Sequence, residues 1–145
     1  MTRPPHFIFA TNKHGDYCIP AEAAHRPAAQ CVLNGAVWES DTIEFILTHC
    51  GEGDILHAGA FFGDALPALS KATRGTVWAF EPNPQSFRAA QITALMNDLK
   101  NVKLMNCALG ARQEQRKLVV RRSPPMARPP RPSSGLSNCV CRDAE

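Results

Sequence analysis

The sequence predicts an α/β fold in which short parallel strands alternate with helices, as in Rossmann-like domains. Three short apolar runs, at 54–58, 76–80 and 101–109, are separated by two segments of helical character, 64–73 and 83–99. Such alternation is typical of β-α-β units and a parallel sheet. A glycine-bearing turn follows the first run and an acid follows the second, the arrangement by which α/β proteins present backbone to a nucleotide-like ligand.

Length and hydropathy restrict the class of protein. At 145 residues the chain has the size of one domain. No apolar run approaches the roughly 18 residues that suggest a membrane span. The apolar stretch near the N-terminus is too short for a signal peptide. We therefore expect a cytoplasmic protein without a membrane partner.

The net charge of +3 is concentrated at the end of the chain. Residues 1–120 carry 11 basic and 11 acidic side chains, whereas 121–145 carry five Arg against two acids. The basic balance belongs to this tail, so it does not indicate a nucleic-acid-binding face. The six cysteines include no C-x-x-C pair, and we expect neither a zinc site nor another bound metal.

Residues 1–34 are expected to form a lead-in segment. The stretch HFIFAT can form a short strand, and NKHGDY a turn. RPAAQCVLNG favours a short helix, with Pro27 in its first turn and Gly35 just past its end. The Asn34-Gly35 pair also permits a hairpin turn at this point.

A helix is predicted over 41–50. Asp41 can cap it, and Glu44 three residues later completes a capping-box pattern. Glycines directly after it end the helix. Its apolar residues recur at helical spacing and form one stripe, Ile43, Ile46, Leu47 and Cys50.

The two helices between the predicted strands have recognisable starts. In 64–73, Pro67 falls in the first turn, where a missing N–H matters least. The helix over 83–99 is capped by Asn83 and has a proline at its first position. A fourth, peripheral strand is expected over 117–120.

The turn after the first strand is the main candidate for a binding site. Gly59 allows a sharp bend and close approach of a ligand. Gly63 lets the next helix begin near the sheet with free N–H groups, which favour an anion or carboxylate. Glu81 lies 22 residues after Gly59. An acid at about this spacing accepts hydrogen bonds from ribose hydroxyls in dinucleotide-binding folds.

The glycine spacing in this turn discriminates between ligands. Residues 59–63 read G-x-x-x-G, whereas the nicotinamide-dinucleotide fingerprint is G-x-G-x-x-G. A ligand with a ribose and a carboxylate but no phosphates, such as S-adenosylmethionine, fits this turn better. The alternative is a plain β-α-β turn with two structural glycines and a capping glutamate.

The stretches GDILHAGAFFGDALPALS, VWAFEPNPQSF and NVKLMNCALG resemble the FkbM family of class I S-adenosylmethionine-dependent methyltransferases. The resemblance covers about residues 34–112, and F-E-P-N-P matches the family pattern letter by letter. It implies S-adenosylmethionine as the cofactor and methyl transfer to an oxygen or nitrogen of a small molecule or sugar. The methionine end of this donor would contact Gly59, Ala60 and Gly63. The ribose would contact Phe80, Glu81 and Asn83, and the adenine Asn106, Cys107 and Ala108.

His57 departs from the family pattern, which has an acid at this position to hold the donor's ammonium group. A neutral imidazole can accept one hydrogen bond there, whereas a protonated imidazole would repel the ammonium. The alternative is a core histidine that points away from the ligand. We expect His57→Asp to leave donor affinity equal or better. Nothing in the sequence positions a general base, so no catalytic residue is assigned.

The resemblance implies a seven-stranded sheet, of which this chain supplies three central strands and one peripheral strand. We therefore expect a truncated methyltransferase domain over 35–120 whose first strand has an unpaired side. The Pro/Arg-rich residues 121–145 lack a hydrophobic period, which predicts a disordered tail. A frameshift in the gene explains this tail better than a designed interaction segment, and the chain would then be an inactive fragment.

Two other functions stay open. A nucleotide-binding Rossmann half-domain predicts protection from thermal unfolding by NAD rather than by S-adenosylmethionine. A non-enzymatic interaction module predicts an acidic or nucleic-acid partner that is lost when 121–145 are deleted.

Overall fold

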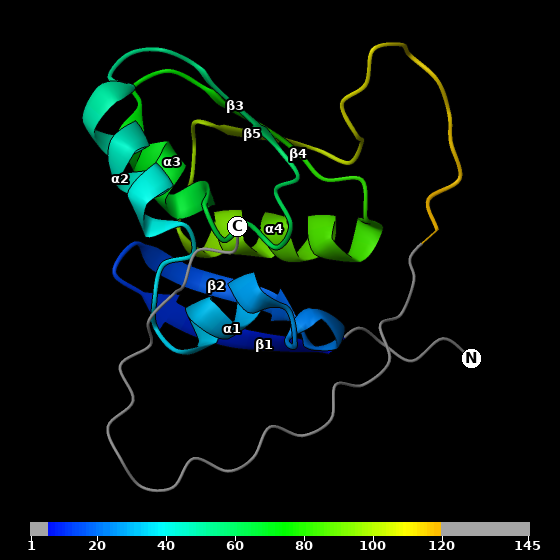
Figure 1. Cartoon of the computed structure of the whole chain (residues 1–145), viewed down its shortest axis with the longest axis horizontal. Coiled ribbons are helices and arrows are strands. Elements are labelled where there is room, and N and C mark those ends of the chain that lie inside the picture. The colour runs from blue at the N-terminus through cyan, green and yellow to red at the C-terminus, as the bar shows by residue number, and fades with distance from the viewer. Residues whose placement is uncertain (1–5, 120–145) are drawn as a thin grey trace, which may run out of the picture.

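The computed structural model describes residues 6–119, which form three layers (Figure 1). One outer layer is a parallel sheet in the order β3-β4-β5. Its strands are β3 (Ile55–Ala58), β4 (Val77–Phe80) and β5 (Val102–Met105). The described residues therefore form an α/β domain, as the sequence predicts.

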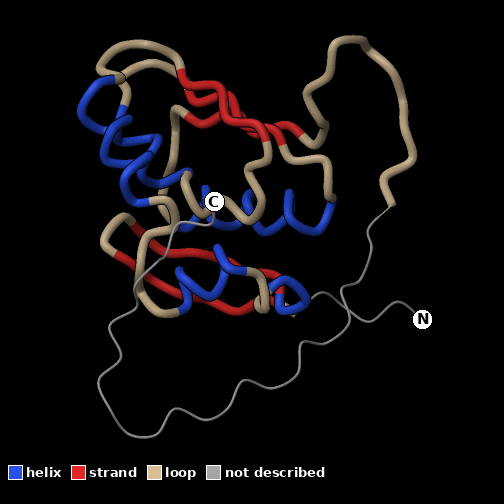
Figure 2. The backbone as a smooth tube through the Cα atoms, in the orientation of Figure 1, coloured by secondary structure: helices blue, strands red, loops and turns tan. Residues whose placement is uncertain are grey.

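Helices form the middle layer beneath this sheet (Figure 2). They are α2 (Ser40–His49), α3 (Leu66–Ala72) and α4 (Pro84–Met96). The third layer is an antiparallel hairpin with two short helices. Its elements are β1 (Phe7–Asn12), β2 (Gly15–Pro20), the 3-10 helix η1 (Ala21–Ala23) and α1 (Pro27–Leu33).

The first hydrophobic core lies between the parallel sheet and its helices. Val77 and Ala79 of β4 are fully buried and pack with apolar side chains of α2, α3 and α4. The opposite face of the sheet is more open: Leu56 is 65 % and Trp78 38 % exposed. Among residues 6–119, β3 pairs only with β4, which agrees with the expected unpaired side of this strand.

The second core joins the hairpin to α4, which lies between the sheet and the hairpin (Figure 1). Tyr17 and Ile19 of β2 are fully buried against this helix. Thr93 is also fully buried; its hydroxyl accepts a hydrogen bond from the Cys18 N–H at 3.0 Å and donates to the Phe62 carbonyl at 2.9 Å. One side chain of α4 thus connects the hairpin to the turn after β3.

The structure corrects two expectations about the N-terminal half. Strand β2 begins at Gly15, inside the stretch 12–17 for which the sequence predicts a turn, and four consecutive residues of this strand, 17–20, are buried. Helix α2 begins at Ser40, and the N–H of Ile43 bonds to the Glu39 carbonyl. No side chain caps this helix, so the predicted Asp41 capping box is wrong. Helix α1 has Pro27 in its first turn, as predicted.

Two expectations about the C-terminal half are also corrected. Strand β5 ends at Met105, four residues before the predicted end at 109. Residues 117–119 are exposed and belong to no strand, so the predicted fourth strand is wrong there. The tail over 121–145 lies outside the described residues. Asn83 caps α4 as predicted, because its Oδ1 accepts the N–H of Gln85 at 2.9 Å.

Candidate functional site

The turn after β3 is tied to the end of β4 by backbone hydrogen bonds. The N–H groups of Gly59 and Ala60 both donate to the Phe80 carbonyl, at 2.8 and 2.9 Å. Gly59 has a φ of +79°, which L side chains rarely adopt. No atom lies within 4 Å of the position that a Cβ on Gly59 would occupy. The backbone here is therefore rigidly placed and open on one side.

Glu81 holds this turn from the neighbouring strand. The residue is 7 % exposed. One carboxylate oxygen accepts the N–H of Phe61 at 2.7 Å, and the other accepts the N–H of Asn83 at 2.8 Å. Hydrogen bonds to an ionised acceptor are short and strong. Glu81 thus fixes the relative position of two turns at the carboxyl edge of the sheet.

Phe61 occupies a strained backbone conformation in this turn. Its φ is +51°, a left-handed value that is rare for a bulky residue. The bond from its N–H to Glu81 helps to maintain this conformation. The guanidinium of Arg26, which precedes α1, lies 5.2 Å from the centre of the Phe61 ring, in the range of a cation–π contact.

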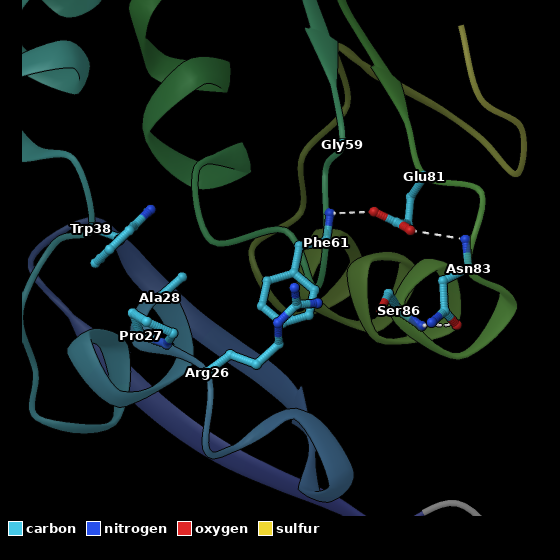
Figure 3. Close-up of a pocket in the computed structure, with 9 residues that line it drawn as sticks. All are labelled: Arg26, Pro27, Ala28, Trp38, Gly59, Phe61, Glu81, Asn83 and Ser86. Carbon is cyan, nitrogen blue, oxygen red and sulfur yellow. Dashed lines mark hydrogen bonds between the residues drawn. The ribbon is translucent and has the colours of Figure 1, made fainter. Parts of the chain in front are cut away.

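A cavity of about 370 Å³ lies between this turn, the start of α4 and the segment around α1 (Figure 3). It is lined by a cation, a buried carboxylate, two aromatic rings, an amide and a hydroxyl, which come from three parts of the chain. The lining residues are Arg26, Pro27, Ala28, Trp38, Gly59, Phe61, Glu81, Asn83 and Ser86. The volume is at the lower end of the range for small-molecule sites.

Of the predicted site residues, the structure brings Gly59, Glu81 and Asn83 together in this cavity. Ala60 is fully buried behind the turn, and Phe80 contributes the carbonyl that holds it. Neither lines the cavity. The Asn106 amide donates to the Glu81 carbonyl at 2.8 Å, so it supports the second turn from behind.

Gly63 has a packing role in this structure. Its N–H donates to the Ala60 carbonyl at 2.7 Å, and α3 begins only at Leu66. The prediction of a helix that begins at Gly63 with free N–H groups is therefore wrong, and the N–H of Leu66 donates to the Gly63 carbonyl at 3.1 Å. A Cβ here would approach Leu66 to 3.1 Å and Thr93 to 3.3 Å, so glycine allows these side chains to pack closely.

Cys107 and Ala108 are exposed and lie outside the cavity. With Asn106 they follow β5 rather than forming its end, which corrects their predicted position in the strand. In the described structure these three residues do not line the cavity that the Gly59 turn lines.

His57 lies on the face of β3 that is covered by helices. It shares this face with Ile55, which packs against the first core. Its Nε2 is buried and has no hydrogen-bond partner. Burial lowers the pKa of the imidazole, and the charge of Glu39 acts against this shift. His57 does not line the cavity.

Asp64 is a further titratable group close to the site. Its pKa is raised to about 6, mainly by burial and in part by the negative charges of Glu39 and Glu81. Hydrogen bonds from the N–H groups of Asp64 and Ala65 act against this rise. Asp64 does not line the cavity. Within residues 6–119, no group of three or more His, Cys, Asp or Glu side chains is arranged to hold a metal ion.

Sequence reasoning missed the part of the cavity wall contributed by the N-terminal segment. Arg26, Trp38 and their neighbours precede the β-α-β units, and only the packing of the hairpin on α4 brings them opposite Glu81. Phe61 lies inside the predicted G-x-x-x-G turn, so the sequence indicates that it is close to the binding site. The sequence does not indicate its left-handed backbone conformation.

The chain gives no match to the models of known protein families or to curated proteins. None of the helices described between residues 6 and 119 combines the length and the apolar character required to cross a membrane.

Proposed function

We propose that the protein binds S-adenosylmethionine in the cavity beside Glu81, in a Rossmann-like domain similar to that of FkbM methyltransferases, and that it transfers a methyl group to a small molecule or sugar in the cytoplasm. The observation that carries this proposal is the juxtaposition of the Gly59 turn with Glu81 in one cavity. These are two elements on which the family resemblance depends.

The residues of this cavity fit such a donor. Glu81 uses one acceptor position on each oxygen for backbone N–H groups. An ionised carboxylate has about four such positions, so acceptors remain for a ribose diol. The space over Gly59 is open, which allows the aliphatic part of the donor to lie against the backbone. When bound, S-adenosylmethionine supplies the reactive sulfonium; the protein binds and orients it.

The same cavity disfavours a nicotinamide dinucleotide. In the described turn the backbone N–H groups of Gly59, Ala60, Phe61 and Gly63 already have protein acceptors. A pyrophosphate needs free backbone donors at this point. The nucleotide-binding alternative therefore has less support than the methyl donor.

Binding of S-adenosylhomocysteine, measured by isothermal titration calorimetry, tests the proposal with a matched pair of variants. Gly59→Ala places a methyl group in the cavity at a φ of +79°. Gly35→Ala adds a methyl group at a similar φ of +76°, past the end of α1, where no atom lies closer than 3.8 Å and where Gly35 does not line the cavity. Both introduce similar backbone strain. We expect roughly tenfold weaker binding for Gly59→Ala alone. Equal affinities of the two variants would contradict the site.

A further inference from the structure

We infer that Arg26 binds the carboxylate of the amino-acid end of the donor. This inference rests on the proposed function, because it concerns a second contact for the same ligand. Glu81 and Arg26 give the cavity a negative and a positive wall. A ligand with a ribose at one end and a carboxylate at the other has groups complementary to both.

The position of Arg26 assigns it to the end of the cavity formed by the Gly59 turn. Its guanidinium lies over the ring of Phe61, two residues after Gly59 (Figure 3). In the proposed orientation this turn holds the methionine portion of the donor, whereas Glu81 holds the ribose. The cation thus lies at the end of the cavity where the carboxylate of the donor would be.

The guanidinium is available for such a contact. Among residues 6–119, Arg26 takes part in no ion pair. The hydrogen bonds in which Arg26 participates come from its backbone. Its planar group offers several N–H donors in a fork that matches a carboxylate.

The local backbone fixes the place from which this side chain extends. Arg26 precedes Pro27, which restricts it to an extended conformation, and its φ and ψ are −75° and 147°. Pro27 begins α1, whose residues Ala29 and Val32 are buried in the second core. Arg26 is therefore anchored at one end by a packed helix and oriented at the other by Phe61. This preorganisation reduces the entropy lost on binding.

Calorimetric titration of the full chain with two ligands tests the inference. One is S-adenosylhomocysteine, and the other is decarboxylated S-adenosylhomocysteine, which lacks only the carboxylate. We expect Arg26→Met to weaken binding of the first roughly ten- to a hundredfold, and of the second less than twofold. Arg26→Lys keeps the positive charge but lacks the forked N–H donors, so it should weaken binding of S-adenosylhomocysteine less than Arg26→Met does. Arg88→Met, an exposed arginine of α4 outside this cavity, should affect neither ligand.

The outcomes separate this inference from the proposed function. If the wild type binds both ligands and Arg26→Met binds S-adenosylhomocysteine as tightly as the wild type, the role of Arg26 is refuted and the donor site stands. Equal losses for both ligands would also refute it, because the effect would not depend on the carboxylate. A wild-type chain that binds neither ligand would overturn the proposed function and this inference with it.

Discussion

Replacement of Glu81 by glutamine tests whether its carboxylate joins the two turns of the site. The carboxylate accepts the N–H of Phe61 at 2.7 Å and that of Asn83 at 2.8 Å. A hydrogen bond to a charged group contributes about 1.5–3 kcal/mol. A glutamine amide has one acceptor oxygen, so it preserves one bond without its charge and turns an N–H donor toward the other backbone N–H. We therefore expect Glu81→Gln to lower the free energy of unfolding by about 2–4 kcal/mol.

Urea unfolding followed by circular dichroism measures this loss. Glu52→Gln is a suitable control, since Glu52 is an exposed glutamate that pairs with Arg74 at 3.3 Å on the surface. That variant should lose less than about 1 kcal/mol. If Glu81→Gln were as stable as the control, the carboxylate would not hold the Phe61 turn, and the reasoning about the site would be wrong.

Three further predictions follow from the packing around the site. Gly63→Ala should destabilise the fold more than Gly59→Ala, because only the Gly63 methyl would collide with neighbouring side chains; thermal unfolding of the pair checks this. Thr93→Val keeps the shape but leaves a buried N–H and a buried C=O unpaired, so urea unfolding should show a loss of about 2–4 kcal/mol, and an unchanged midpoint would contradict it. Because the folded-state pKa of Asp64 is raised from 3.8 to about 6, the folded state holds this proton more tightly than the unfolded state. Stability should therefore fall as pH rises from about 4 to 6, and Asp64→Asn should remove about 2–3 kcal/mol of that fall; identical pH profiles would refute it.

The order of strands and helices after residue 50 could be predicted because local signals agree with the tertiary structure. Apolar runs mark β3 and β4, and Asn83 followed by Pro84 marks the start of α4, whose cap the structure contains. Strand β2 was missed because four consecutive residues, 17–20, are buried, in a core that also contains side chains of α1 and α4. Its sequence therefore lacks the alternation by which half-buried strands are recognised.

The candidate site could be predicted only where it depends on backbone turns. Gly59 and Glu81 lie at the ends of adjacent parallel strands, and parallel pairing brings such ends together. Arg26 reaches the same cavity through contacts between elements far apart in sequence, which no local pattern encodes. Gly63 was predicted as a site residue, but the structure explains this glycine by its close packing against Thr93 of α4.

Titration of the wild-type chain with S-adenosylhomocysteine, beside an identical titration with NAD, tests the central claim most directly. The account predicts saturable binding of S-adenosylhomocysteine to one site per chain, with no comparable heat from NAD. Failure to bind S-adenosylhomocysteine, or tighter binding of NAD, would contradict the assignment of this cavity to a methyl donor.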